Sequence, residues 1–174
     1  MLLFFVYSII RVDVLFMKYK IIELDERYFA GIEHHKEIVF GKDELISVSW
    51  NKMFHEVYNN IKLKMDPHQM IGLNCNAIDF EDTQMVTYYV LTEIIDVVDQ
   101  LDGIITKKLP KGKYVCFEVH YGMLGTERKQ VYDYCKKEGL QIHEGFDFEM
   151  YDNSIKYGDN PDAVLQLCLK LEND

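Results

Sequence analysis

EGFDFEMYDN, residues 144–153, is the segment whose pattern decides the fold. Within it, apolar side chains alternate with two carboxylates and a phenol, in the order Phe146, Asp147, Phe148, Glu149, Met150 and Tyr151. Strict alternation of this kind predicts a β-strand whose two faces meet different surroundings. One face is apolar and belongs to a core. The other face carries Glu149 in the middle of the strand, and that position needs a physical reason.

The elements around this strand come in an order that occurs twice. The first series predicts a bent strand or two strand pieces, then a helix and two strands, at 18–35, 44–61, 70–76 and 85–94. The second series predicts a strand, a helix and two strands, at 111–122, 124–138, 146–152 and 163–171. The helices follow from apolar residues three and four positions apart, and the strands follow from runs of β-forming residues between turns.

The repeated order predicts two similar β-α-β-β halves, at about 17–95 and 104–172, within one domain that covers 17–174. Two pairs of residues match at one common offset of 86, namely Tyr28 with Tyr114 and His34 with His120. The predicted fold class is α+β with pseudo-two-fold symmetry: an antiparallel sheet carries helices on one face and a ligand groove on the other. A cleft is expected near the junction of the halves, because ligand sites often form there.

The composition limits the kinds of partner. The chain has 174 residues, 48% of them hydrophobic, and a formal net charge of −10. A nucleic-acid interface needs a basic face that neutralises phosphates, so no direct nucleic-acid binding is expected. An acidic protein attracts cations instead, although the charge is equally well explained by solubility alone.

The cysteines and histidines do not have the spacing of a metal site. None of the four cysteines, Cys75, Cys116, Cys135 and Cys168, forms a C-x-x-C pair, and the six histidines are scattered. The pattern predicts buried free thiols in a reducing compartment such as the cytoplasm, with no disulfide, metal or cofactor.

The first sixteen residues are treated as a separate segment. MLLFFVYSII at 1–10 is apolar but too short to span a bilayer, and it lacks the flanks of a secretory signal. Met17 then opens a stretch that reads as an ordinary protein start. Residues 1–16 are therefore predicted to be an N-terminal extension that reflects the choice of start site, with a membrane-surface or docking segment as the alternative.

Motifs of the common enzyme classes are absent: the sequence has no G-x-S-x-G, Walker loop or G-x-G-x-x-G. Two strand glutamates remain as candidates, Glu118 in YVCFEVHYG and Glu149 in FDFEMYD. If helices cover the wholly apolar faces, both glutamates point to the uncovered face of the sheet. That face is either solvated or an aromatic groove with a carboxylate floor, which suits a flat cationic ligand.

Four stretches together resemble the GyrI-like small-molecule-binding domain, which is the effector-binding domain of AraC-type and MerR-type multidrug regulators. They are ELDERYFAGIEHH, ISVSWNKMFHEV, KLPKGKYVCFEVHYG and FDFEMYDN with NPDAVLQLCLKL. The resemblance covers residues 17–171. Two features depart from the family: the closing strand lacks its usual proline, and residues 1–16 have no counterpart.

The resemblance implies a ligand site. Glu149 matches the acidic residue that helps members of the family to bind cationic aromatic compounds, and Tyr151 matches the Tyr of the same motif. Trp50 and Tyr114 match aromatic positions on the first helix and on the first strand of the second half. With Glu118 from the strand pattern, five residues form the predicted ligand site. Asp147 is interpreted as an ordinary acid at the end of the strand.

The predicted elements leave no helices for a DNA-binding helix-turn-helix, so with the resemblance we expect a stand-alone effector-binding protein. Its ligand would be a small hydrophobic molecule, with cationic aromatic compounds included. Two alternatives stay open. One is a hydrolase of reactive natural products, in which Glu149 would act as general acid or base. The other is a protein-interaction module with a regulator or a gyrase as its partner, as in the DNA gyrase inhibitor members.

Overall fold

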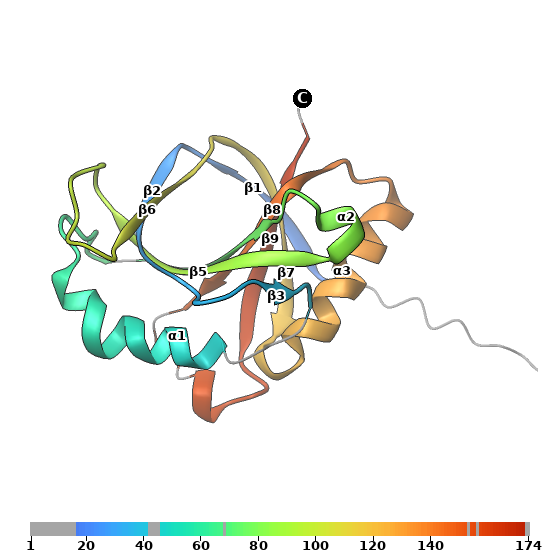
Figure 1. Ribbon diagram of the computed structural model, residues 1–174. Helices are drawn as coiled ribbons and strands as arrows, with labels where there is room; N and C mark the ends of the chain where they lie inside the picture. Colours follow the sequence, from blue (N-terminus) through green and yellow to red (C-terminus); the bar gives the residue numbers. More distant parts are fainter. Residues whose placement is uncertain (1–16, 42–45, 68, 153, 156, 173–174) are drawn as a thin grey trace, which may run out of the picture.

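The structure is a computed structural model that describes residues 17–41, 46–67, 69–152, 154–155 and 157–172 (Figure 1). The predicted extension at 1–16 lies outside the described residues. The strands are β1 (Tyr19–Leu24), β2 (Arg27–Glu33), β3 (Ile38–Val39), β4 (Met70–Asn76), β5 (Met85–Ile94), β6 (Ile105–Leu109), β7 (Gly112–His120), β8 (Ile142–Tyr151) and β9 (Val164–Leu171). The α-helices are α1 (Ile46–Lys52), α2 (Phe80–Thr83) and α3 (Leu124–Glu138). The predicted α+β class with an antiparallel sheet is confirmed.

All nine strands form one sheet, and its order shows how two halves are combined. The order is β1-β7-β9-β8-β4-β5-β2-β6, with β3 added to β5. This order is symmetric about the β8–β4 pair, because β9 matches β5, β7 matches β2 and β1 matches β6. Strands β1 and β2 are the two strand pieces that the sequence allows at 18–35, whereas β3 in the first half and β6 in the second were not predicted. Strands β1 and β6 each pair with the other half, β1 with β7 and β6 with β2.

The two longer helical segments have the positions that the sequence predicts. Helix α3 ends at Gly139, whose φ of 71° gives the left-handed conformation that favours glycine at a helix C-terminus. Helix α1 continues through a π-helical turn at Met53–Val57 and a 3-10 turn at Tyr58–Asn60. Turns of the π type are frequent at functional sites, because they re-aim the side chains around them.

The sheet curls, and this fills the face that carries no helix. One core cluster lies between the sheet and the helices and includes Met53 from the α1 segment and Val131 from α3. A second cluster lies on the opposite face and includes Phe148 from the middle of the sheet and Leu109 from its β6 end, with Leu24 of β1 packed against it. Both ends of the sheet thus enclose one apolar interior, as the arch of strands in Figure 1 shows. The prediction of an uncovered, groove-bearing face opposite the helices is wrong.

The prediction of four free cysteines is also wrong. Cys116 on β7 lies directly opposite Cys168 on β9, with a Cα–Cα distance of 4.1 Å, and the two form a disulfide. Cys75 and Cys135 are free. Sequence spacing could not show this pair, because 52 residues separate the partners and only the strand register brings them together.

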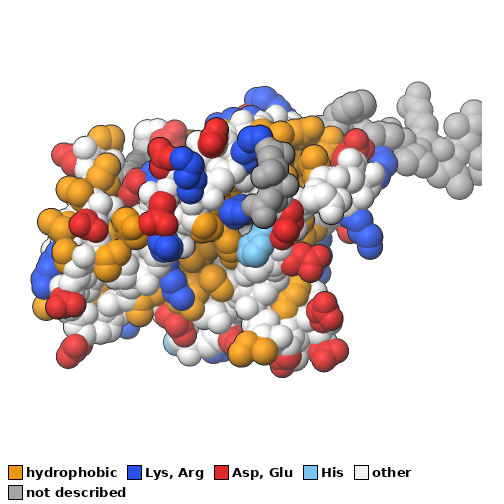
Figure 2. All heavy atoms as spheres, turned by 90° about the horizontal axis from the view of Figure 1, so that it is seen from above, with side chains coloured by type: hydrophobic (Ala, Val, Ile, Leu, Met, Phe, Trp, Pro, Cys, Tyr) orange, Lys and Arg blue, Asp and Glu red, His pale blue; other side chains and the backbone are white. Residues whose placement is uncertain are grey.

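Acidic and basic side chains are interspersed on the face shown in Figure 2, so this face has no single-sign basic surface of the kind that binds nucleic acid. Among the described residues, no helix is long and apolar enough to cross a membrane.

Candidate functional site

The alternation in β8 places its polar face toward the helices. Phe146 and Phe148 point into the interior of the curled sheet, whereas Glu149 and Tyr151 point toward α1 and α3. The prediction that Glu149 faces the side without helices is therefore wrong. The curled sheet takes the wholly apolar side of the strand, which leaves the polar side to meet the helices.

Glu149 is completely buried, and each of its two carboxylate oxygens accepts two hydrogen bonds. Oε1 accepts from the guanidinium of Arg128 on α3 and from Asn74 Nδ2 at 3.3 Å. Oε2 accepts from the hydroxyl groups of Tyr88 at 2.9 Å and Tyr151 at 3.0 Å. An ionised carboxylate offers about four acceptor positions, so these donors occupy all of them.

Asp147 belongs to the same cluster and is not an ordinary acid at a strand end. Its side chain is 1% exposed. It accepts hydrogen bonds from Tyr132 on α3 at 2.9 Å and from Asn74 Nδ2 at 3.0 Å. Arg128 Nε lies 3.6 Å from Asp147 Oδ2, the oxygen that also accepts from Tyr132, and this is an ion-pair distance rather than a hydrogen bond.

The buried charges of this cluster do not cancel. Two carboxylates, Asp147 and Glu149, face the one guanidinium of Arg128. Burial acts to lower the pKa of Arg128, but the charges of Asp147 and Glu149 outweigh it and raise the pKa, so the guanidinium stays charged. Burial raises the pKa of Asp147, whereas the positive charge of Arg128 acts to lower it. With all three groups ionised, the cluster has an excess of one negative charge.

A cavity of about 210 Å³ lies above this cluster. It is lined by residues from α1, the sheet and the start of α3, namely Ile46, Ser47, Trp50, Tyr88, Tyr121, Gly122, Leu124 and Tyr151. Trp50 donates from Nε1 to the Tyr88 hydroxyl at 3.0 Å, and its ring centroid lies 4.6 Å from that of Tyr151. We call this cavity the aromatic pocket. Tyr88 and Tyr151 form its floor, and Glu149 lies beneath them.

Gly72 makes room for these contacts. It stands opposite Glu149 in the register of β4 with β8. A Cβ atom at this position would lie 2.1 Å from Glu149 Oε2 and 2.2 Å from the Tyr88 hydroxyl. Any larger residue would therefore displace either the carboxylate or the phenol.

The two halves contribute equivalent parts to the site. His34 at the end of the first half's strand lies 2.7 Å from Ser49 Oγ, and His120 at the end of the second half's strand lies 3.0 Å from Glu127. The helix residues that follow Ser49 and Glu127 are Trp50, which lines the aromatic pocket, and Arg128, which bonds to Glu149. The two histidines keep the offset of 86, whereas Ser49 and Glu127 are 78 positions apart, so the halves repeat a strand–helix contact without one common register.

Two of the five predicted ligand residues lie away from the pocket. Tyr114 points into the sheet interior, where its hydroxyl donates to the carbonyl of Pro110 at 2.6 Å and burial raises its pKa to about 12. Glu118 is partly exposed on the same face and forms an ion pair with Lys18 at 2.7 Å. The structure brings together the other three, Trp50, Glu149 and Tyr151.

Sequence reasoning missed the groups that position Glu149, chiefly Arg128, Tyr88 and Asn74. One signal was present for Arg128. It falls on the same helical face as Leu124, Val131 and Cys135, which are all buried. A charged residue at an apolar helix position predicts a buried ionic partner.

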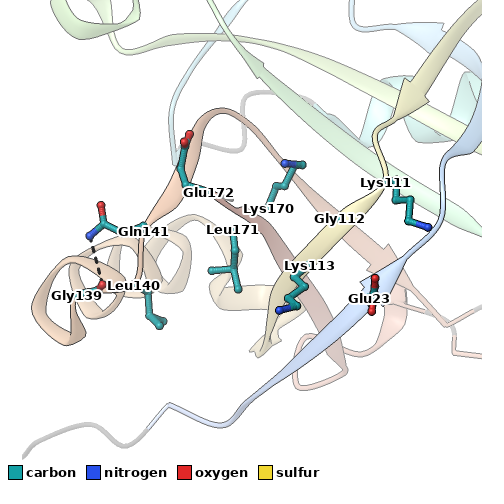
Figure 3. A pocket seen from close by; sticks show the side chains of 10 residues that line it. All are labelled: Glu23, Lys111, Gly112, Lys113, Gly139, Leu140, Gln141, Lys170, Leu171 and Glu172. Carbon is teal, nitrogen blue, oxygen red and sulfur yellow. Dashed lines mark hydrogen bonds between the residues drawn. The ribbon is translucent and has the colours of Figure 1, made fainter. Parts of the chain in front are cut away.

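A larger cavity, of about 440 Å³, lies where the C-terminal end of α3 meets β7 and β9 (Figure 3). Its described lining residues include Lys113, Lys170 and Glu172 but no aromatic side chain. It therefore lacks the flat apolar walls of a site for aromatic ligands. The described residues contain no group of three His, Cys, Asp or Glu side chains that could hold a metal ion.

Comparisons with known proteins point to one family. The GyrI-like small molecule binding domain matches residues 17–171. Among solved structures, SAV2435 bound to tetraphenylphosphonium has a TM-score of 0.69 at 17% identity, over 90% of this chain and 95% of that chain. The C-terminal domain of EcmrR has a TM-score of 0.67 at 13% identity, over 92% and 100% of the two chains. A hydrolase from Listeria innocua has a TM-score of 0.53 at 13% identity, over 89% and 92%. No curated protein sequence matches the chain.

Proposed function

The chain belongs to the family of GyrI-like small-molecule-binding domains, and from this premise we propose that its aromatic pocket binds small hydrophobic cations with aromatic groups. The observation that carries the proposal is that two buried carboxylates, Asp147 and Glu149, share one guanidinium directly beneath an aromatic-lined cavity. Carboxylates attract a cation, and Trp and Tyr ring faces add cation–π attraction. Trp50, Tyr88 and Tyr151 supply those faces.

The relatives with the same fold support this class of ligand. SAV2435 has been solved with tetraphenylphosphonium, an aromatic cation. EcmrR binds DNA in a transcription complex, and its C-terminal domain has the fold of this chain. We therefore place the pocket among the sensor sites of transcription regulation, where a ligand-binding domain reports the presence of a compound.

The size of the pocket sets a condition on binding. Ligand sites usually occupy about 300–1,000 Å³, and the aromatic pocket has about 210 Å³. A ligand with several rings must therefore displace a wall, and Trp50 is a wall residue that lies directly before the π-helical turn of the α1 segment. Trp50 is also the single tryptophan of the chain, so its fluorescence reports on the pocket alone.

The test is a titration with tetraphenylphosphonium that follows the fluorescence of Trp50. We expect saturable binding to the wild type and roughly tenfold weaker binding to Glu149→Gln, because the substitution removes the excess charge. Glu118→Gln is the matched control, since it removes the same charge from the opposite face, and its affinity should equal that of the wild type. Equal affinities of Glu149→Gln and the wild type would refute the role of Glu149.

Hydrolysis is the second candidate, and the Listeria innocua hydrolase with the same fold favours it. In that case Glu149 would act on a water molecule. Its four acceptor positions are already occupied and Tyr88 and Tyr151 separate it from the cavity, so the geometry supports binding better than general-base catalysis. Mass spectrometry separates the two, because a binder returns its ligand unchanged and a hydrolase adds water to it. A regulator or gyrase-type protein partner stays a prediction from the resemblance.

A further inference from the structure

We propose that Asp147, which does not line the aromatic pocket, determines the preference of the pocket for cations. The guanidinium of Arg128 neutralises Glu149, and Asp147 supplies the negative charge that remains. The inference rests on the proposed function, since it concerns the ligand charge that the same pocket accepts. It adds Asp147, the acid behind the floor, to Glu149 as a determinant of the ligand charge that the pocket prefers.

The guanidinium of Arg128 interacts unequally with the two acids. Arg128 makes its direct hydrogen bond to Glu149, whereas its Nε is 3.6 Å from Asp147. Asn74 Nδ2 donates to both carboxylates, at 3.0 Å to Asp147 and 3.3 Å to Glu149, and thus holds them in one arrangement. The closest ion pair is therefore Arg128 with Glu149, and Asp147 is the acid with the weaker cationic partner.

Neither Asp147 nor Glu149 is available for direct contact with a ligand in the pocket. Among the described residues, those that line the pocket include Tyr88 and Tyr151 but no carboxylate. A ligand therefore responds to the field of the cluster and not to a hydrogen bond with it. At an effective dielectric constant of about 20, one unit charge about 8 Å from a cation changes its affinity on the order of tenfold or more. Asp147 lies farther from the pocket than Glu149, because its partners Asn74 and Tyr132 do not line the pocket, but at such a distance its charge still acts on a bound cation.

The effect of the Asp147 charge can be distinguished from a purely structural role of this residue. Asp147 also accepts a hydrogen bond from Tyr132 and so fixes α3 against the sheet. If it acted only through packing, its loss would weaken the binding of all ligands by a similar factor. If it acts through its charge, its loss weakens the binding of a cation but leaves or strengthens the binding of an anion of the same shape.

The experiment measures the affinities of tetraphenylphosphonium and tetraphenylborate, which have the same shape and opposite charge. For the wild type we expect the cation to bind more tightly. Asp147→Asn should lower the cation-to-anion ratio of affinities by roughly tenfold or more. Glu118→Gln changes the net charge of the protein by the same amount at the surface and should keep the wild-type ratio.

A second variant covers the case in which Asp147→Asn does not fold. The double substitution Arg128→Gln with Glu149→Gln replaces the ion pair by two neutral amides, which can still donate and accept hydrogen bonds within the cluster. Asp147 is then the remaining charge of the cluster, and we expect the preference for the cation to persist without Glu149. Loss of the preference in this variant would overturn the proposal, as would an unchanged ratio in Asp147→Asn. A wild type without any preference would instead contradict the proposed function.

Discussion

Gly72 illustrates how a residue without a side chain shapes this site. The carboxylate of Glu149 and the hydroxyl of Tyr88 occupy the space in which a Cβ atom would stand. The backbone at Gly72 needs no left-handed conformation, so the requirement for glycine here is one of space alone. The buried carboxylate and its phenol partners therefore depend on a residue of the facing strand.

Gly72→Ala should consequently disturb both stability and binding. We expect a loss of about 1–3 kcal/mol in the free energy of unfolding, as is usual for overpacked cores, because the new methyl group must displace Glu149 or Tyr88. Urea unfolding measures this. Gly158→Ala serves as the control, since nothing lies within 4 Å of a Cβ atom there. Equal stabilities of the two variants would contradict the packing account of Gly72.

At the level of single residues, three of the predicted ligand residues, Trp50, Glu149 and Tyr151, lie at or directly beneath the aromatic pocket. They could be named from the sequence because they match positions of the family's strand motif and first helix. Asp147 was misread because its partners, Arg128 and Tyr132, come from a helix whose docking the strand pattern does not reveal. Tyr114 was misplaced because alternation separates two faces without showing which one meets the helices.

Among the elements, strands β7 and β9 show most clearly why the prediction of four free cysteines was wrong. Their register pairs Cys116 with Cys168 in the sheet interior. The two Cα atoms are close enough for a disulfide. A bond between these strands restrains the unfolded chain across a long loop, which stabilises the fold.

The thiol content tests this bond. The protein denatured without reductant should show two reactive thiols, those of Cys75 and Cys135, and four after reduction. A colorimetric thiol assay gives these numbers directly. Four reactive thiols in the unreduced protein would show that Cys116 and Cys168 are not bonded.

Strand β6 is an element that the sequence alone could not predict. Its segment, ITKKL, is short and contains two adjacent lysines, and it was not predicted as a strand. Lysines are common on edge strands because they discourage pairing with another chain. Its partner β2 belongs to the other half, and no local pattern predicts such an exchange. Helix α3, in contrast, has its predicted bounds because its periodicity and Gly139 are local signals.

For the whole molecule, three tyrosines buried around the acidic cluster link its stability to alkaline pH. Burial, and then the charge of Glu149, raises the pKa of Tyr88 and Tyr151, and burial followed by the charge of Asp147 raises the pKa of Tyr132. Phenols of the unfolded chain ionise near about pH 10. Above that pH the unfolded state binds fewer protons than the folded state, so stability decreases as pH rises.

We therefore expect the urea midpoint to be lower at about pH 10.5 than at about pH 8, because the buried phenols keep their protons only while the protein is folded. Tyr132→Phe removes one of these protons and should make the decrease smaller. An unchanged or higher midpoint at the alkaline pH would contradict the burial of these phenols.

The central claim concerns the whole molecule, because the pocket joins α1, the middle of the sheet and the start of α3. A crystal structure of the protein grown with tetraphenylphosphonium tests it most directly. We predict the cation in the aromatic pocket, within about 6 Å of the ring centroids of Trp50 or Tyr151, with Arg128 still bound to Glu149. A cation found only at the lysine-lined cavity of Figure 3, or at no site in a crystal of the saturated protein, would contradict the account.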